Sequence, residues 1–198
     1  NLRVLADRYF GTRPYVVGKP DCVLPVDVRV DAGTQVGPDR LVNTVAGYDL
    51  YGGDLIVVDF GTATVFDAIS SDGDYLGGAI AAGINVAADA LFLNTSQLRR
   101  VELTPPKSAI GRNTVASMQS GLLLGHIGLV EGMVARFQSE IGGDARVVAT
   151  GGLAEVIAKE TGIFDAVNPD LTLIGLRLIY EMNHGSELES HDSQEEVC

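Results

Sequence analysis

An apolar run that ends in a glycine-containing turn constrains the fold of this chain more than any other feature. Residues 55–58 read Leu-Ile-Val-Val, and Asp59-Phe60-Gly61-Thr62-Ala63-Thr64 follows directly. An uninterrupted apolar run of this length is typical of a strand buried on both faces of a sheet. Such a strand must be covered by other elements, so the sequence predicts a layered globular domain.

Two further strands are expected directly after this one. Residues 65–69 form the first, and residues 75–80 form the second. The Ser-Asp-Gly-Asp turn at 71–74 has the residue types of a tight hairpin, so the three segments predict an antiparallel meander. Short strands are also expected at residues 15–17 and at the alternating segment 26–30, and a buried strand at 146–149.

Helical periodicity surrounds these strands. The sequence predicts helices at residues 2–10, 40–50, 84–98, 113–141, 153–160 and 168–182. In the longest of them, four glycines recur every three or four residues and share one face: Gly121, Gly125, Gly128 and Gly132. Since glycine weakens a helix, another element is expected to approach this face closely. It is either a helix of the same chain or a helix of a symmetric partner.

Charge and hydropathy exclude two classes of partner. The chain of 198 residues has a net charge of −12, which argues against nucleic acid because phosphate binding needs a basic surface. The longest candidate membrane segment, 115–137, falls short of about twenty uninterrupted apolar residues, since it contains Gln119, His126, Glu131 and Arg136. The first ten residues lack the apolar stretch of a signal peptide, so a cytoplasmic protein is expected.

Several polar and glycine-rich segments follow the predicted strands. Asp59 at a strand end could hold a cation, and Thr62 offers a hydroxyl and an amide to phosphate oxygens. Glycine-rich turns are also expected at Gly77-Gly78 and at Gly151-Gly152, which suggests one phosphate-binding cleft. The alternative is that these segments are only tight turns with a capping aspartate.

Five segments together, in their order and spacing, resemble type III pantothenate kinases. They are Gly37-Pro38-Asp39-Arg40, Asp59-Phe60-Gly61-Thr62-Ala63-Thr64, the glycine- and alanine-rich segment 77–83, Gly111-Arg112-Asn113-Thr114 and Ala149-Thr150-Gly151-Gly152. The resemblance covers residues 1–183. It implies an α/β, ribonuclease-H-like fold of the actin and sugar-kinase type, with two domains and mixed sheets. It also implies ATP-dependent phosphorylation of pantothenate to 4'-phosphopantothenate, the first step of coenzyme A biosynthesis.

The resemblance assigns substrate roles to two segments. Asp39 matches the family's proton acceptor, which takes the proton of the pantothenate hydroxyl, although an aspartate at a helix N-terminus can also be a plain cap. Gly37, Pro38 and Arg40 match the substrate-binding segment, in which Arg40 pairs with the pantothenate carboxylate or, alternatively, with a neighbouring aspartate. Thr114 matches a second substrate contact and could also cap its helix beside Asn113.

The resemblance also implies cofactors and assembly. Asp59 matches the ligand of a monovalent cation, K⁺ or NH₄⁺, and Thr62 matches the contact to the phosphates of ATP, which is bound with Mg²⁺. The family's homodimer would place the glycine-faced helix near the partner subunit.

Three parts of the chain are expected on this basis. Residues 1–50 would be the remainder of a first ribonuclease-H-like domain, incomplete in this chain, and residues 51–183 a second such domain. Residues 184–198 would be an acidic disordered tail. The family's Asp-x-Gly-Asn-Thr phosphate turn does not occur in the printed sequence, so we expect that this chain lacks it and is inactive alone. Val30 departs from a tyrosine that contacts substrate in many members.

Two other functions compete with the kinase. The first is a non-catalytic regulatory relative that resembles the Bvg accessory factor, and the second is a related sugar or acetate kinase. The presence of Asp39, Arg40, Asp59 and Thr62 together favours the pantothenate kinase, because a protein retained only for interactions does not need all of them.

Overall fold

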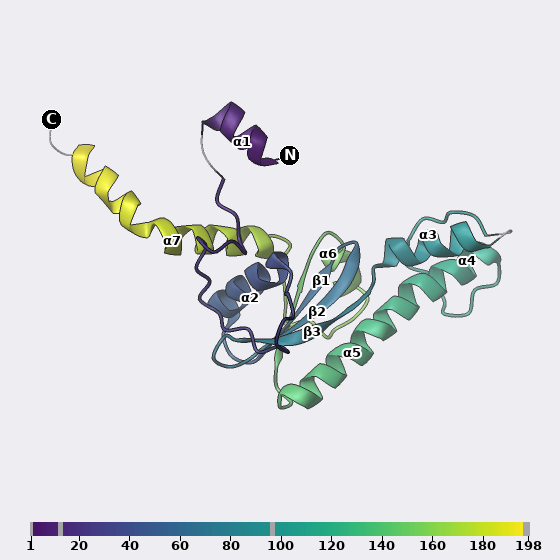
Figure 1. Ribbon diagram of the computed structural model, residues 1–198. Coiled ribbons are helices and arrows are strands. Elements are labelled where there is room, and N and C mark those ends of the chain that lie inside the picture. The colour runs from purple at the N-terminus through teal and green to yellow at the C-terminus, as the bar shows by residue number, and fades with distance from the viewer. Residues whose placement is uncertain (1, 12–13, 96–97, 196–198) are drawn as a thin grey trace.

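The computed structural model describes residues 2–11, 14–95 and 98–195, with only the backbone for residues 2, 3 and 185–195. A five-stranded mixed sheet lies at its centre in the order β3-β2-β1-β4-β5 (Figure 1). The antiparallel meander expected from the sequence is confirmed as β1 (Leu55–Phe60), β2 (Ala63–Ile69) and β3 (Tyr75–Ala82). β4 (Arg146–Thr150) and β5 (Ala166–Val167) extend the sheet in parallel to β1. This order is typical of ribonuclease-H-like domains, so the expected α/β class is confirmed.

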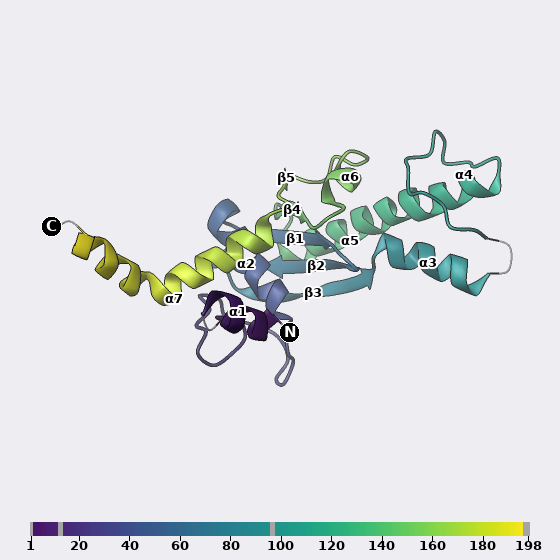
Figure 2. The same ribbon diagram turned by 90° about the horizontal axis from the view of Figure 1, so that it is seen from above.

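Helices cover the two faces of the sheet. Helix α2 (Pro38–Tyr51) and helix α7 (Leu171–Glu195) lie on one face, where Ala46 and Leu171 pack against Leu55, Val57 and Val148. Helix α5 (Gly125–Ile141) lies on the other face (Figures 1 and 2). There the alternate strand residues pack against it: Ile56, Val58, Phe60, Phe66 and Val147. The alternation of side chains along each strand therefore separates two cores.

The long helix predicted at 113–141 is present with one irregularity. It begins as α4 (Thr114–Gln119), continues through a π-helical turn (Ser120–Leu124) and runs on as α5. The side chain of Asn113 caps it by accepting a hydrogen bond of 2.9 Å from the Ala116 amide. Together with α3 (Ile84–Asn94), which ends earlier than predicted, α4 extends beyond the sheet (Figure 1).

The glycine-bearing face of this helix is open in the described part of the chain. A Cβ atom added at Gly121, Gly125 or Gly128 would meet no described atom within 4 Å apart from the backbone of its own helix, and one at Gly132 would meet only Arg136 of the same helix. The close approach by another helix of the same chain, one of the two alternatives for this face, is therefore not observed among the described residues.

The strands predicted before α2 are not formed. Residues 15–17 are irregular, and segment 26–30 contributes only a single bridge, from Val28 to Tyr75. Apolar residues of this region instead pack onto the pair α2 and α7, where Leu24 and Val26 contact the cluster around Val42 and Ile179. Burial against helices thus takes the place of strand pairing.

The remaining helices differ from prediction mainly at their ends. Helix α1 (Leu2–Phe10) is confirmed, whereas α6 (Ala154–Ala158) is shorter than predicted. Helix α7 was expected to end at Met182 but continues to Glu195, through most of the segment expected to be a disordered tail. No proline interrupts residues 171–195, and glutamate-rich sequence is compatible with a helix. Residues 196–198 of that expected tail lie outside the described residues.

Helices α2 and α7 cross at very close range. A Cβ atom at Gly175 of α7 would collide with the carbonyl oxygen of Val42 on α2, so only glycine fits at this crossing. Beside it, the Thr172 hydroxyl of α7 donates a hydrogen bond of 2.7 Å to the Asn43 side-chain oxygen on α2. None of the described helices is both long enough and apolar enough to span a bilayer.

Candidate active site at the start of helix α2

The site begins with the first turn of α2. Gly37 is its N-cap residue and Pro38 starts the helix, where a missing N–H is harmless. Asp39 is exposed in the first turn, and its Oδ1 accepts a hydrogen bond of 3.0 Å from the Arg40 amide. The N-cap position itself belongs to Gly37, so Asp39 is not the capping residue. Its other carboxylate oxygen has no hydrogen bond within the described chain, which suits a proton acceptor.

Asp59 lies near Asp39, at the carboxyl end of β1. The Asn43 side chain, one helical turn after Asp39, donates a hydrogen bond of 3.2 Å to Asp59 Oδ2. Burial raises the pKa of the Asp59 carboxyl, the Asn43 hydrogen bond opposes this, and the Asp39 charge raises it further. The Asn43 hydrogen bond therefore joins the helix that carries Asp39 to the strand end that carries Asp59.

The surroundings of Asp59 suit a cation. Thr150 is its register partner on β4, and the Thr150 hydroxyl is buried without a hydrogen-bond partner in the described chain. A Cβ atom at Gly151 would lie 2.5 Å from Asp59 Oδ1, so the glycine leaves the space that this carboxylate occupies. A half-buried carboxylate and an unsatisfied hydroxyl at paired positions are two oxygen ligands that a cation could share. No group of three or more His, Cys, Asp or Glu that could hold a metal occurs among the described residues.

Thr62 lies on the exposed turn between β1 and β2. Its carbonyl accepts a hydrogen bond of 3.1 Å from the Gly83 amide, and the Gly61 amide donates one of 3.0 Å to the Ala63 carbonyl. The Thr62 side chain remains exposed beside the end of β1, so it is accessible to a phosphate. Gly77-Gly78, however, is not a turn: both glycines pair with β2 inside β3, which corrects the prediction for that segment.

Arg40 turns toward the sheet. Its Nε donates a hydrogen bond of 2.7 Å to Asp67 Oδ1 on β2, so the alternative interpretation of Arg40, an ion pair with an aspartate, is observed. The Tyr75 hydroxyl on β3 donates to the same oxygen over 3.1 Å. Burial raises the pKa of Asp67 to about 6 against the opposing effect of Arg40. The pairing of Arg40 with a substrate carboxylate stays a prediction.

Thr114 is not part of this cluster. It is exposed at the start of α4, which lies beyond the sheet, and no described contact joins it to Asp39 or Asp59 (Figure 1). The described chain therefore brings together residues 37–40, Asp59 and the Thr62 turn, but not Thr114.

Sequence patterns missed three residues that contact the site and one buried polar residue on the other face of the sheet. Asn43, Asp67 and Tyr75 support the site, and a fourth residue, His126 of α5, lies on the opposite face of the sheet, where its Nε2 is 3.0 Å from the Thr64 hydroxyl. Only Asp67 carried a signal, because a charged residue inside a buried strand requires a partner.

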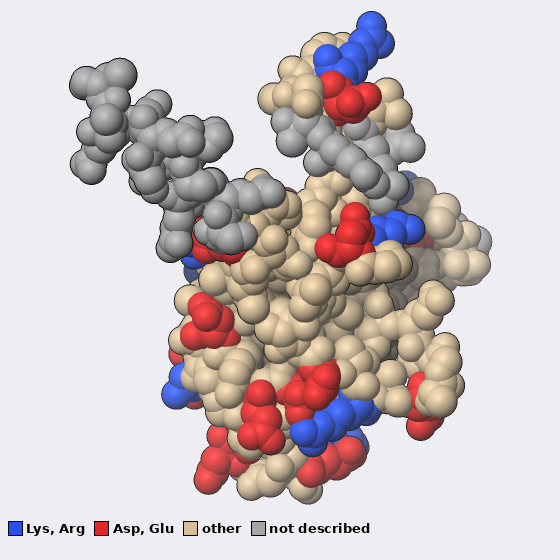
Figure 3. All heavy atoms as spheres, turned by 60° about the vertical axis from the view of Figure 1, so that its left-hand side comes forward, with Lys and Arg blue, Asp and Glu red and all other residues tan. Residues whose placement is uncertain are grey.

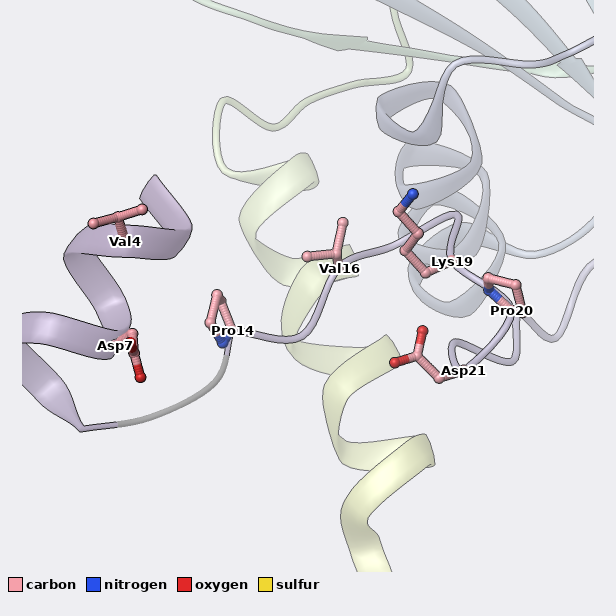
Figure 4. Close-up of a pocket in the computed structure, with 7 residues that line it drawn as sticks. All are labelled: Val4, Asp7, Pro14, Val16, Lys19, Pro20 and Asp21. Carbon is pink, nitrogen blue, oxygen red and sulfur yellow. The ribbon is translucent and has the colours of Figure 1, made fainter. Parts of the chain in front are cut away.

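A large surface hollow lies elsewhere. It has a volume of about 510 Å³ and separates α1 from the loop at residues 14–21 (Figure 4). Its lining consists of Val4, Asp7, Pro14, Val16, Lys19, Pro20 and Asp21, so none of the predicted site residues contributes. On the side of the molecule where α7 lies, basic side chains stand among acidic ones and form no continuous patch (Figure 3).

Comparison with known proteins defines the class. The family model described as type III pantothenate kinase matches residues 1–136. A type III pantothenate kinase from Roseobacter denitrificans is 58% identical over 94% of this chain and 73% of its own length. One from Ruegeria sp. is 56% identical over 96% of this chain and 73% of its own length. The chain is therefore a kinase by its sequence relatives. It belongs to the type III pantothenate kinase family.

A solved structure supports the fold independently. A Baf family transcriptional activator from Campylobacter jejuni superimposes with a TM-score of 0.58 at 22% identity, over 82% of this chain and 70% of that protein. At this identity the likeness concerns the fold alone, so it does not favour the regulatory alternative.

Proposed function

We propose that the intact protein transfers the γ-phosphoryl group of ATP to the primary hydroxyl of pantothenate, yielding 4'-phosphopantothenate for coenzyme A biosynthesis. The observation that carries this proposal is the convergence of Asp39 and Asp59 beside the exposed Thr62 turn, in a chain of this kinase family. A non-catalytic regulator would not need these groups together.

In this proposal Asp39 accepts the proton of the attacking hydroxyl. Phosphoryl transfer has a loose transition state, so the proton can leave late and a weak base suffices when it is well oriented. The backbone of α2 orients Asp39, because the carboxylate accepts the Arg40 amide and lies in the positive field of the helix N-terminus. Gly37, Pro38 and Arg40 would bind the substrate, and Arg40 would face its carboxylate.

Thr62 would bind the phosphates of ATP, which is used with Mg²⁺. Asp59 would hold a monovalent cation, K⁺ or NH₄⁺, with the Thr150 hydroxyl as the unsatisfied oxygen beside it. The cation would supply positive charge near the transferred phosphoryl group. Thr114 would contact substrate only if a further element brings it there.

Three wider features complete the proposal. The open glycine face of the π-helical turn and α5 supports a homodimer formed through this helix. Residues 1–50 and 51–183 would belong to two ribonuclease-H-like domains, followed by an acidic tail. A cytoplasmic location is proposed because ATP is supplied there.

The test is a coupled assay on the full-length protein. ADP release is measured with pantothenate, with K⁺, NH₄⁺ or Na⁺ as the monovalent ion, and the product is identified by mass spectrometry. We expect 4'-phosphopantothenate and stimulation by K⁺ or NH₄⁺. Lack of turnover with every cation would reject the kinase proposal, whereas equal rates in Na⁺ would reject only the cation assignment.

A further inference from the structure

A buried ion pair lies directly behind the first turn of α2. Arg40 Nε and Nη2 both lie 2.7 Å from Asp67 Oδ1, and the Tyr75 hydroxyl donates to that oxygen over 3.1 Å. The Asp67 side chain is 1% exposed and the Arg40 side chain 17%. The guanidinium carbon also lies 5.4 Å from the centre of the Tyr75 ring. Side chains from two strands therefore hold one arginine of the helix.

Besides Asp67 and Tyr75, a glycine of β3 lies against the Arg40 guanidinium. A Cβ atom at Gly78 would collide with Arg40 Nη2 and with the Phe66 carbonyl oxygen. β3 thus leaves space for the guanidinium where other residues would fill it, at a position that pairs with Asp67 on β2. The arginine is enclosed by Asp67, Tyr75 and the backbone at Gly78, and it has little rotational freedom.

Fold stability alone does not account for this arrangement. Removing two charges from water costs several kcal/mol per ion, and apolar residues of similar volume often stabilise a fold equally well. The pair is also imperfectly satisfied, because Nη2 is misaligned for a hydrogen bond. Within the described chain, Arg40 Nη2 and Asp67 Oδ2 have no hydrogen-bond partner. Such incomplete pairing suggests that the arginine is held for a ligand.

The guanidinium group of Arg40 also has one edge, at Nη1, that is left for a ligand. Asp67 engages only Nε and Nη2, and Nη1 makes no hydrogen bond or ion pair with any described residue. Arg40 and Asp39 point in different directions from α2, but the Asp39 charge still raises the pKa of Asp67, so the ion pair lies in the surroundings of Asp39. A planar guanidinium with one free edge is suited to a carboxylate.

We propose that Asp67 and Tyr75 are positioning residues that hold the Arg40 guanidinium, so that Arg40 selects a substrate bearing a carboxylate. This inference rests on the proposed kinase function and deepens it. Asp67 and Tyr75 act through Arg40 and do not touch the reacting atoms.

The test compares variants of the full-length enzyme on two substrates. Asp67→Asn and Tyr75→Phe are assayed with pantothenate and with its alcohol analogue, in which CH₂OH replaces the carboxylate. Asp72→Asn is the matched control, since Asp72 is an exposed aspartate in the turn between the same two strands. Melting temperatures are recorded for every variant.

The expected signature is a change in KM for one substrate. Loss of a charge-assisted contact is worth about tenfold, so Asp67→Asn should raise the KM for pantothenate roughly tenfold and Tyr75→Phe about threefold. The KM for ATP and the kinetics of the alcohol analogue should stay within about twofold of wild type. In an Arg40→Gln background, Asp67→Asn should have no further effect, because the arginine through which it acts is gone.

Several results would overturn the proposal. It fails if both variants keep the pantothenate KM of Asp72→Asn, if the KM values for pantothenate and ATP rise together, or if the alcohol analogue is affected equally. It also fails if both variants unfold below the assay temperature, since the pair is then structural. A wild-type enzyme that turns over pantothenate separates these failures from failure of the kinase proposal itself.

Discussion

The two faces of the central sheet share the same strands but differ in chemistry. On the face covered by α2 and α7, Asp59, Asp67 and Asn43 form polar contacts beside a small apolar cluster. On the face covered by α5, the side chains form one large apolar core in which Thr64 and His126 are a polar pair. Alternation along β1 and β2 decides which face each residue joins.

This difference suggests that one face of the sheet contributes mainly to stability and the other mainly to function. The α5 face holds the largest of the buried apolar clusters, so we expect it to contribute more of the folding free energy. The α2 face carries buried charges, which contribute little stability but hold groups in place. Substitutions on the α2 face should change kinetics more than stability, and substitutions on the α5 face should do the reverse.

The largest effect is expected at Asp39. Asp39→Asn removes the proposed proton acceptor but keeps the size of the side chain, so kcat should fall by about 100-fold or more. The melting temperature should change little because the side chain is exposed. Steady-state kinetics and a thermal melt measure both quantities, with Asp72→Asn as the control. A rate within a few-fold of wild type would contradict the assignment of Asp39.

The next effect concerns stability on the opposite face. Phe66 is fully buried against α5, so Phe66→Ala should lower the free energy of unfolding by about 3–5 kcal/mol. Denaturation in urea measures the loss. Where the variant is folded, its KM for pantothenate should match wild type. A selective rise in that KM at an unchanged free energy of unfolding would contradict the division between the faces.

A smaller effect is expected from pH on the α2 face. Asp67, which faces Arg40, Tyr75 and the charge of Asp39, has a pKa raised to about 6 by burial. Only its ionised form pairs with Arg40, and at pH 5.5 roughly a quarter of such a carboxyl is ionised. The KM for pantothenate should therefore rise roughly fourfold from pH 8 to pH 5.5. Asp67→Asn should flatten this profile, and an unchanged profile would argue against Asp67 as its source.

The smallest effect is expected at His126. Burial lowers its pKa below the usual 6.5, so the unfolded chain takes up the proton first as the pH falls. The stability tied to neutral His126 is fully present above about pH 6.5 and is lost as the pH falls through the folded-state pKa. Urea denaturation at pH 7.5 and 5.5 should show a steeper loss for wild type than for His126→Gln. Parallel losses would exclude this histidine as the cause.

The three strands of the meander could be predicted because each is marked by residues within or directly beside it. The apolar run at 55–58 and the Asp72-Gly73 turn need no distant partner to be recognised, and β1, β2 and β3 follow. The segment 26–30 alternates equally well but has only one bridge, from Val28 to Tyr75. Whether an alternating segment finds a neighbouring strand depends on the tertiary fold.

The site was predictable only to the level of motifs. Asp39, Asp59 and Thr62 stand in recognisable segments, and the structure brings those segments together. The partners that hold them are far away in the chain: Asp67 lies 27 residues from Arg40, and Thr172 lies 129 residues from Asn43. Pairings at such separations follow from topology, which no single motif encodes.

The crossing of α2 and α7 connects the C-terminal helix to the candidate active site. With no side chain at Gly175, the two helix backbones interlock at Val42, one turn from Asp39. Helix α7 is therefore in direct backbone contact with the helix that carries Asp39, the proposed proton acceptor. Beside this contact, Thr172 of α7 binds the same Asn43 side chain that binds Asp59, so one chain of contacts joins the C-terminal helix, α2 and the end of β1.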